Sequence, residues 1–442
     1  MTRYVARRLP RLAGPAAWNE ILGPAPAYPP LEGDITAEFV VVGAGFAGLS
    51  AAQRLTQLRP NARIVLLEAT RIAEGAAGRN SGFMIDLPHD LTSADYKGAG
   101  DDAARIALNR QAIAFARDAV AEYGIKPDYF DEAGKVNGAA SPAAEAHNQS
   151  YAAHLAGLGE TFEHLDAKAM QDLTGSAHYH SGLFTPGTVM LQPAGYIRGL
   201  AAGLAQYVQV HERSPVISLK RQGSGWQVQV PAGTISAPRV ILAVNGHLES
   251  FGFAKNRLMH VFLYASMSSV LPDGAIGGAA RWGITPSDPM GTTLRRIDTG
   301  QGGNRIVTRT VATLRSDMKI TTKDIARATA VQRKKFDARF PGFAGLMPEY
   351  EWAGGLCLSR NGVSVTGEID AGLFAACVQN GLGTVRGTMT GIAAAEMACG
   401  ESTAFTRHCA AEDAPTRLPP APIRDIGGNA VIRYREWKAR AE

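Results

Sequence analysis

The sequence predicts an α/β fold in which a Rossmann-like domain carries an inserted, mainly antiparallel β-sheet domain. Two observations lead to this prediction. Near the N-terminus, a glycine-rich turn joins a buried apolar strand to an amphipathic helix, and a second buried strand follows. Between residues 257 and 320, strand-like runs alternate with turns rich in glycine and proline, as in an antiparallel sheet. A chain of 442 residues is long enough for two such domains.

The first 38 residues are expected to form an N-terminal arm. Four arginines (Arg3, Arg7, Arg8 and Arg11) precede any acidic residue and supply most of the net charge of +5. The rest of the chain is nearly neutral, so we expect no nucleic-acid partner. Arginines and Pro10 also interrupt the apolar core that a secretory signal needs, and no apolar stretch is long enough to span a membrane. A cytoplasmic protein is therefore expected.

The βαβ unit follows a proline-rich segment, 21–38, which we expect to be extended without strand or helix. The run 39–42 is β-branched and apolar, as in a strand buried on both faces. Apolar residues at threefold and fourfold spacing then predict a helix that ends before Pro60, and 63–67 reads as the second strand.

Later segments complete the two domains. We expect helices at 101–123 and 143–158, alternating strand residues at 226–230, buried strands at 239–244 and 373–378, and a helix at 384–399 closed by Gly400. The Rossmann-like domain is predicted to comprise 39–100, 160–250 and 345–442, and the inserted domain 101–159 and 251–344.

The glycine-rich turn has the spacing of a dinucleotide site. Gly43 permits a tight turn, Gly45 lets a pyrophosphate approach the backbone, and Gly48 lets helix and strand pack closely. The helix N-terminus then offers free N–H groups to the anion. Glu68, 20 residues after Gly48 at the end of the second strand, is expected to accept hydrogen bonds from a ribose. This unit alone does not distinguish NAD from FAD.

Two further segments favour a flavin. A small, polar, glycine-rich loop, 69–82, follows directly where a purely NAD-dependent fold usually continues into a helix. The segment 380–384 leads into the C-terminal helix, whose positive end suits the anion that forms on a reduced flavin. The predicted cofactor contacts in these three segments are Gly43, Ala44, Gly45, Phe46, Ala47, Glu68, Ala69, Arg71, Gly78, Arg79, Asn80, Ser81, Gly82, Gly381, Leu382, Gly383 and Thr384.

With these segments, the chain resembles the D-amino acid oxidase superfamily, most closely its gamma-glutamylputrescine oxidase-like branch. The resemblance is carried by PAYPPLEGD, VVVGAGFAGLSAA, GRNSG, LQPAGY, AVNGH, and the W-x-G pattern at 352–354 that continues to NGLGT and Gly391. It implies an FAD-dependent amine oxidoreductase with a discontinuous FAD domain and a β-sheet substrate domain over the flavin, a glutathione reductase-2-like fold. It also adds Val216 and Asn245 to the cofactor contacts.

The sequence departs from the family pattern at three positions. Leu356 stands where amino-acid oxidases often have an arginine for the substrate carboxylate, which weakens the case for an ordinary α-amino acid. Cys357 is one residue late for the cysteine that holds flavin covalently in sarcosine oxidase-like members, so non-covalent FAD is expected. Leu382 replaces a histidine that relatives often carry. No cysteine spacing suggests a metal site.

The implied reaction moves a hydride from the carbon next to a neutral amine to flavin N5, giving an imine that water hydrolyses, with oxygen or another carrier as the final acceptor. The protein then needs substrate anchors more than a strong base. The anchor candidates are Asp86, His89, Arg309 and Tyr264, with Arg295, Arg296 and Trp282 as weaker ones. Lys319 is a weaker candidate for promoting the reaction with oxygen, and His247 and His260 are weaker candidates for a base. For each, a loop, capping or core role is the alternative. An NAD-dependent dehydrogenase and a non-catalytic FAD-binding subunit remain alternative functions, and the oligomeric state is not predicted.

Overall fold

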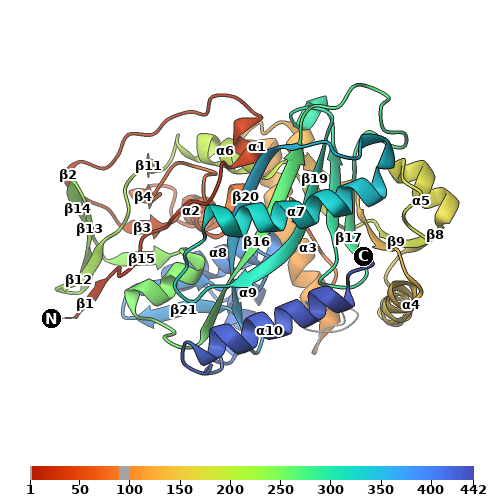
Figure 1. The fold of residues 1–442 in the computed structure, drawn as a ribbon. Helices are drawn as coiled ribbons and strands as arrows, with labels where there is room; N and C mark the ends of the chain where they lie inside the picture. The colour runs from red at the N-terminus through yellow and green to blue at the C-terminus, as the bar shows by residue number, and fades with distance from the viewer. Residues whose placement is uncertain (1, 89–99) are drawn as a thin grey trace.

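The computed structural model describes residues 2–88 and 100–442 (Figure 1). Its centre is a six-stranded sheet that is parallel except for its last strand. The strands, in spatial order, are β11 (Gln209–His211), β4 (Ile64–Leu67), β3 (Phe39–Val42), β15 (Arg239–Leu242), β22 (Leu373–Cys377) and β21 (Val365–Asp370). This is the predicted Rossmann-like sheet, and β3 and β4 are the two strands of the predicted βαβ unit.

Alternate residues of this sheet enter two separate cores. Val41, Leu66 and Ile241 pack against a layer of helices, whereas Val40, Val65 and Leu242 face a small β-sheet on the other side. Full burial on both faces explains why these strands are continuous apolar runs. The helices of the first layer are α2 (Phe46–Leu58), α3 (Asp102–Glu122), α6 (Pro193–Leu204) and α8 (Val385–Cys399).

The small sheet corrects the prediction for the N-terminal arm. Its strands, in spatial order, are β1 (Arg3–Val5), β12 (Ser218–Gln222), β13 (Gly225–Val230), β14 (Gly233–Ala237) and β2 (Gly33–Thr36). Segment 21–38 was expected to contain no strand, yet it includes β2, and the arm before it includes β1. These two strands form both edges of the sheet because β12 and β14 would otherwise expose unpaired backbone groups. Trp18, in α1 (Ala17–Glu20), is also fully buried.

The second large sheet is the predicted, mainly antiparallel one; only β17 and β7 pair in parallel. Its eight strands, in spatial order, are β20 (Pro348–Ser359), β16 (Leu258–Ser268), β19 (Arg305–Leu314), β18 (Thr293–Ile297), β17 (Trp282–Pro286), β7 (Lys135–Ala139), β9 (Ser181–Thr185) and β8 (Glu163–Asp166). Figure 1 shows α7 (Thr322–Arg339) lying across this sheet and α10 (Ile423–Lys438) along its lower margin.

Strand pairing does not follow the predicted domain limits at three points. β8, β9 and β20 belong to the eight-stranded sheet, although their segments were assigned to the Rossmann-like domain. Conversely, α3 packs on α6 and α8. α3 therefore packs on helices of the Rossmann-like domain, although its segment was assigned to the inserted domain.

The remaining elements are short or peripheral. They are the three-stranded sheet β5 (Phe83–Met84), β10 (Val189–Leu191) and β6 (Phe130–Asp131), and the helices α4 (Pro142–Gly157), α5 (Ala167–Thr174) and α9 (Ala404–Ala411). In the part of the chain that the structure describes, no helix is both long and apolar enough to cross a membrane.

Candidate active site

A cavity of about 1080 Å³ lies between the six-stranded and eight-stranded sheets. It brings together almost all of the predicted cofactor contacts. The predicted residues that line it are Gly43, Ala44, Gly45, Phe46, Ala47, Glu68, Ala69, Arg79, Asn80, Ser81, Gly82, Val216, Asn245, Gly381, Leu382, Gly383 and Thr384. Arg71 and Gly78 do not line it: Arg71 is exposed, and Gly78 is buried in a turn against the carbonyl of Ala73.

The glycine-rich turn leaves space and hydrogen-bond donors at one end of the cavity. Gly43 has a φ of +102°, and a Cβ there would lie 2.6 Å from the carbonyl oxygen of Ala243. Only glycine fits this position. α2 begins after Gly45, and no side chain caps its first turn. Its N–H groups are therefore available to an anion in the cavity, as a pyrophosphate requires.

Glu68 stabilises the same turn. Its carboxylate accepts hydrogen bonds from the backbone N–H of Ala44 at 3.1 Å and of Thr70 at 3.0 Å. Burial raises the pKa of the Glu68 carboxyl, and these hydrogen bonds oppose the shift. The position at the end of β4, in the cavity wall, is the one expected for an acceptor of ribose hydroxyls.

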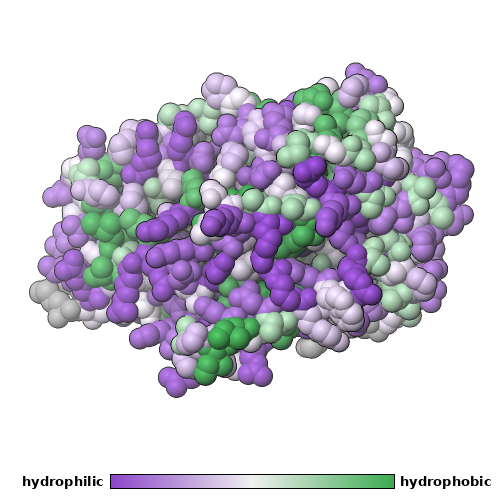
Figure 2. Space-filling model, in the orientation of Figure 1, coloured by the Kyte–Doolittle hydropathy of each residue, from purple (hydrophilic) through white to green (hydrophobic). Residues whose placement is uncertain are grey.

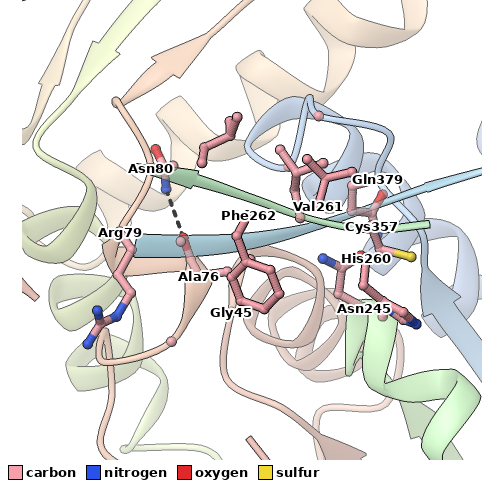
Figure 3. A pocket seen from close by; sticks show the side chains of 18 of the residues that line it. Gly45, Ala76, Arg79, Asn80, Asn245, His260, Val261, Phe262, Cys357 and Gln379 are labelled. Atoms are coloured by element: carbon pink, nitrogen blue, oxygen red, sulfur yellow. Dashed lines mark hydrogen bonds between the residues drawn. The ribbon is translucent and has the colours of Figure 1, made fainter. Parts of the chain in front are cut away.

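Side chains of the loop after β4 bind its own backbone, and Figure 3 shows Asn80 donating to the carbonyl of Ala76. The amide of Asn80 donates to the carbonyl of Ala77 at 2.6 Å and accepts from the N–H of Gly82 at 2.8 Å. Arg79 is buried and donates to the carbonyls of Glu74 at 2.6 Å and Ala13 at 3.0 Å. Burial lowers the pKa of Arg79. The N-terminal segment thus fixes the loop that is predicted to contact the flavin.

The C-terminal loop closes the site from the other side. Gly381, Leu382 and Gly383 lie in the cavity wall, and α8 begins directly after Thr384 without a side-chain cap. The hydroxyl of Thr384 donates instead to the carbonyl of Phe83 at 2.7 Å, which ties this loop to the strand after the GRNSG loop. The positive end of a second helix therefore faces the same cavity.

Cys357 lies in the cavity wall beside His260 and Asn245 (Figure 3). Burial raises the pKa of the Cys357 thiol well above its ordinary value, which disfavours the thiolate that a covalent link would need. His260 is bound to the carboxylate of Glu249 at 2.7 Å. His247 also lines the cavity, and burial lowers its pKa to about 4.

A β-bulge shapes the part of the cavity that lies on the eight-stranded sheet. Leu263 pairs with Ala312 and Tyr264 with Thr310, so Val311 is the extra residue, and its φ is +69°. Such a backbone is strained for a β-branched side chain, and strain of this kind often marks functional sites. The bulge places Arg309 and Ala312 on one face of the sheet, although they are three residues apart.

Arg309 is the anchor candidate that this geometry supports. It lines the cavity and pairs with Ala265, on the same face as Leu263. Leu356, the position of the missing family arginine, pairs with Val261 on that face too. Arg309 is thus a basic residue in a part of the cavity wall whose other residues are mainly aliphatic.

The other anchor candidates do not form a common site. Asp86 is fully buried outside the cavity and pairs with Arg110 of α3 at 3.0 Å. Tyr264 touches the cavity, but its side chain belongs to the apolar cluster under α7. Trp282 and Arg296 are buried elsewhere, and Lys319 is exposed in the segment before α7; none of the three lines the cavity. His89 lies outside the described residues.

Arg295 has a structural role that its sequence position does not reveal. It is fully buried, lies 5.1 Å from the ring centroid of Trp18, and donates to the carbonyl of Ser81 at 3.2 Å. Arg295 therefore stabilises the loop 69–82 through Ser81 without reaching the cavity.

Two groups of cavity residues were not predicted. One is Leu9–Ala13 in the N-terminal segment, and the other is the inner face of α10, including Gly427, Gly428, Val431 and Ile432. The amphipathic spacing of 423–438 was a signal for α10, but nothing in the sequence indicates where that helix packs. Among the described residues, no cluster of three or more side chains could hold a metal ion.

The cavity fits FAD. Two uncapped helix N-termini, the steric need for Gly43 and the carboxylate of Glu68 match an extended dinucleotide along β3, β4 and the start of α8.

Comparisons with known proteins agree with this geometry. A family model described as DAO, FAD dependent oxidoreductase, matches residues 38–397. The probable oxidoreductase OrdL of Haemophilus influenzae is 25% identical over 395 residues, which cover 85% of each chain. The gamma-glutamylputrescine oxidoreductase of Escherichia coli is 28% identical over 230 residues, 49% of this chain and 51% of that protein.

Solved structures show the same fold. Glycine oxidase from Geobacillus kaustophilus superposes with a TM-score of 0.70 at 16% identity, over 87% of this chain and all of that chain. L-proline dehydrogenase from P. horikoshii superposes with a TM-score of 0.64 at 15% identity, over 84% of this chain and 96% of that chain. The family match spans most of the chain and sets aside the nicotinamide alternative. The chain therefore belongs to the DAO family of FAD-dependent oxidoreductases, and its cofactor is FAD.

Proposed function

We propose that the protein oxidises a C–N bond of an amine, either a secondary amine or a derivative of a polyamine or amino acid. The observation that carries the proposal is Arg309, which lines the same cavity as the FAD-binding turn and lies on an otherwise aliphatic sheet face. A guanidinium there suits a substrate that bears a carboxylate away from the reacting carbon. The names of similar proteins, which refer to glycine, L-proline, L-amino acids and gamma-glutamylputrescine, support an amine.

Bound FAD, held without a covalent bond, supplies the acceptor for a hydride from the carbon next to the amine nitrogen. The chain's own residues bind and orient the substrate. Arg309 holds the distant carboxylate, and the side chains of Val261, Leu263 and Leu356 exclude water around the reacting carbon. Hydride loss requires the neutral amine, and among the described residues Glu68 is the one carboxylate in the cavity wall. The product is an imine, which water hydrolyses.

The proposal is tested by mixing the purified flavoprotein anaerobically with four amines: a diamine, an N-methyl amino acid, a gamma-glutamylated diamine and a D-amino acid. Loss of the flavin absorbance with one class supports amine oxidation, and the rate of recovery in air separates an oxidase from a dehydrogenase. If dithionite bleaches the flavin and no amine does, the proposal fails and a non-catalytic FAD-binding protein remains.

Arg309→Met and Arg309→Lys refine this test. We expect Arg309→Met to raise KM about tenfold or more for amines that carry a carboxylate and to leave KM for a diamine nearly unchanged. Arg309→Lys keeps the charge, and its KM for amines that carry a carboxylate should lie between those of the parent protein and Arg309→Met. An equal rise in KM for both substrate classes would contradict the anchoring role.

The four cysteines support a reducing compartment. All are free thiols, and Cys357, Cys377 and Cys409 are buried. We therefore propose a cytoplasmic location.

A further inference from the structure

α10 forms one wall of the substrate part of the cavity, although it lies beyond residues 38–397, where the family model matches. α10 crosses the part of β19 that does not pair with β18. Along this stretch of β19, α10 side chains replace a neighbouring strand. Glu436 accepts from the N–H of Ala312 at 2.8 Å, and Asn429 both accepts from the N–H and donates to the carbonyl of Leu314 at 3.0 Å.

Both ends of α10 are also fixed. Arg424 donates to the hydroxyl of Ser316 at 2.9 Å, where the N-terminal segment also arrives through Arg8. Beyond the other end, the backbone of Glu442 accepts from Thr292 at 3.1 Å. α10 is therefore a fixed wall of the cavity.

Two adjacent glycines interrupt this helix, and only one has a packing reason. Glycine inside a helix is destabilising relative to alanine. A Cβ at Gly428 would lie 2.8 Å from the side chain of Leu314, so that glycine permits close contact with β19. A Cβ at Gly427 would meet nothing within 4 Å, although Gly427 lines the cavity.

Gly427 lies in the middle of a row at the cavity mouth. Ile423, Gly427 and Val431 are spaced by one helical turn, and all three are exposed while also lining the cavity. Figure 2 shows hydrophobic atoms over the N-terminal half of α10, where Ile423 is 63% and Ile426 69% exposed. Glycine in this row leaves a gap between two apolar side chains.

The gap opens beside an aliphatic compartment. Ile432 of α10 packs with apolar side chains from β16, β19 and β20. These are Met259, Val261, Leu263, Ala312, Leu314, Leu356 and Leu358. A small amine such as glycine has no group that would use this surface.

We propose that α10 is a selectivity helix, and that the gap at Gly427 admits amines carrying an aliphatic chain, which packs in the compartment beneath Ile432. This inference rests on the proposed amine oxidation and names the substrate class of that site. Each methylene that enters the compartment should improve binding about fourfold.

The test uses N-methyl-, N-butyl- and N-hexylglycine as substrates, with flavin bleaching as the readout. The ratio of kcat/KM for N-hexylglycine to that for N-methylglycine should be about a hundredfold or more in the parent protein. Gly427→Leu should lower this ratio at least tenfold. Ala430→Leu, on the exposed face of the same helix and outside the cavity, is the matched control and should leave the ratio unchanged. An unchanged ratio in Gly427→Leu overturns the proposal.

Isothermal titration calorimetry with hexanoate and octanoate provides a readout that needs no turnover. We expect Kd to fall about sixteenfold for the two added methylenes in the parent protein and in Ala430→Leu, but not in Gly427→Leu. A Kd independent of chain length overturns the inference. If no amine bleaches the flavin while the length dependence is present, amine oxidation fails and the aliphatic site stands.

Discussion

The carboxylate of Glu436 in α10 accepts a hydrogen bond from the backbone N–H of Ala312 in β19 at 2.8 Å. This bond satisfies a buried donor that a neighbouring strand would normally satisfy, and it fixes the helix over the cavity. Glu436 also pairs with Arg433, whose guanidinium donates to the carbonyl of Ala312 at 2.7 Å. One residue of β19 is thus held by two residues of α10.

Glu436→Ala should therefore lower the free energy of unfolding by about 1–3 kcal/mol, because it leaves the N–H of Ala312 buried without a partner. Glu436→Gln keeps a hydrogen-bond acceptor and should lower the free energy of unfolding less. Urea unfolding of the holoprotein measures both variants. If Glu436→Ala and Glu436→Gln unfold at the same urea concentration as the parent, the bond does not fix α10.

Gly391 controls how closely α8 approaches α2. A Cβ at this position would overlap the carbonyl oxygen of Ala47, in the first turn of the helix that faces the pyrophosphate site. Gly391→Ala should push the two helices apart, destabilise the protein by about 1–3 kcal/mol and weaken FAD binding. Gly157→Ala is the control, since nothing lies within 4 Å of a Cβ there. Thermal unfolding and FAD titration of the apoprotein would show no difference between the two variants if the helices can adjust freely.

Most residues predicted to contact FAD line one cavity, and they could be picked out of the sequence because their signals are local. Gly43, Gly45 and Glu68 belong to one βαβ unit, in which a tight turn and a strand end fix where the residues lie. The substrate half depends on contacts between distant segments. Arg309 faces the cavity because of a bulge at Val311, and neither the bulge nor the pairing of β16 with β19 has a sequence signal.

The same reason explains why Asp86 lies outside the cavity and why the N-terminal residues pair with distant parts of the chain. Asp86 follows the flavin loop, but Arg110, 24 residues later on α3, draws its carboxylate away from the cavity. The N-terminal residues look like a solvated arm because their partners, β12 and Ala353, lie hundreds of residues away. Neither pairing leaves a local pattern.

Glu68→Gln tests the ribose acceptor. Glutamine retains an oxygen for the N–H of Ala44 but lacks the charge that strengthens hydrogen bonds from two ribose hydroxyls. We expect FAD to bind about 5- to 30-fold more weakly to the apoprotein, corresponding to about 1–2 kcal/mol. Fluorescence titration with FAD measures this change. An unaltered Kd would show that the ribose does not lie at the end of β4.

Lys135 gives the protein a predictable response to alkaline pH. It is fully buried on β7, donates to the hydroxyl of Thr285 at 3.3 Å, and also contacts Asn137. Burial lowers the pKa of Lys135 from 10.5 to about 8. Between these two values the unfolded chain binds a proton that the folded protein does not, so stability should rise as the pH rises from 8 to 10.5. The buried charge costs about 3 kcal/mol below pH 8.

Lys135→Met removes this charge. The free energy of unfolding of the variant minus that of the parent protein should therefore be higher at pH 7 than at pH 10. Because the variant also leaves Asn137 and Thr285 without their donor, the pH dependence of the difference is the informative quantity, not its size at one pH. Urea unfolding at pH 7, 8, 9 and 10 should show the two free energies shifting relative to one another by about 2–3 kcal/mol in favour of the parent as pH rises. A difference that stays constant across this range would mean that Lys135 titrates alike in the folded and unfolded chains.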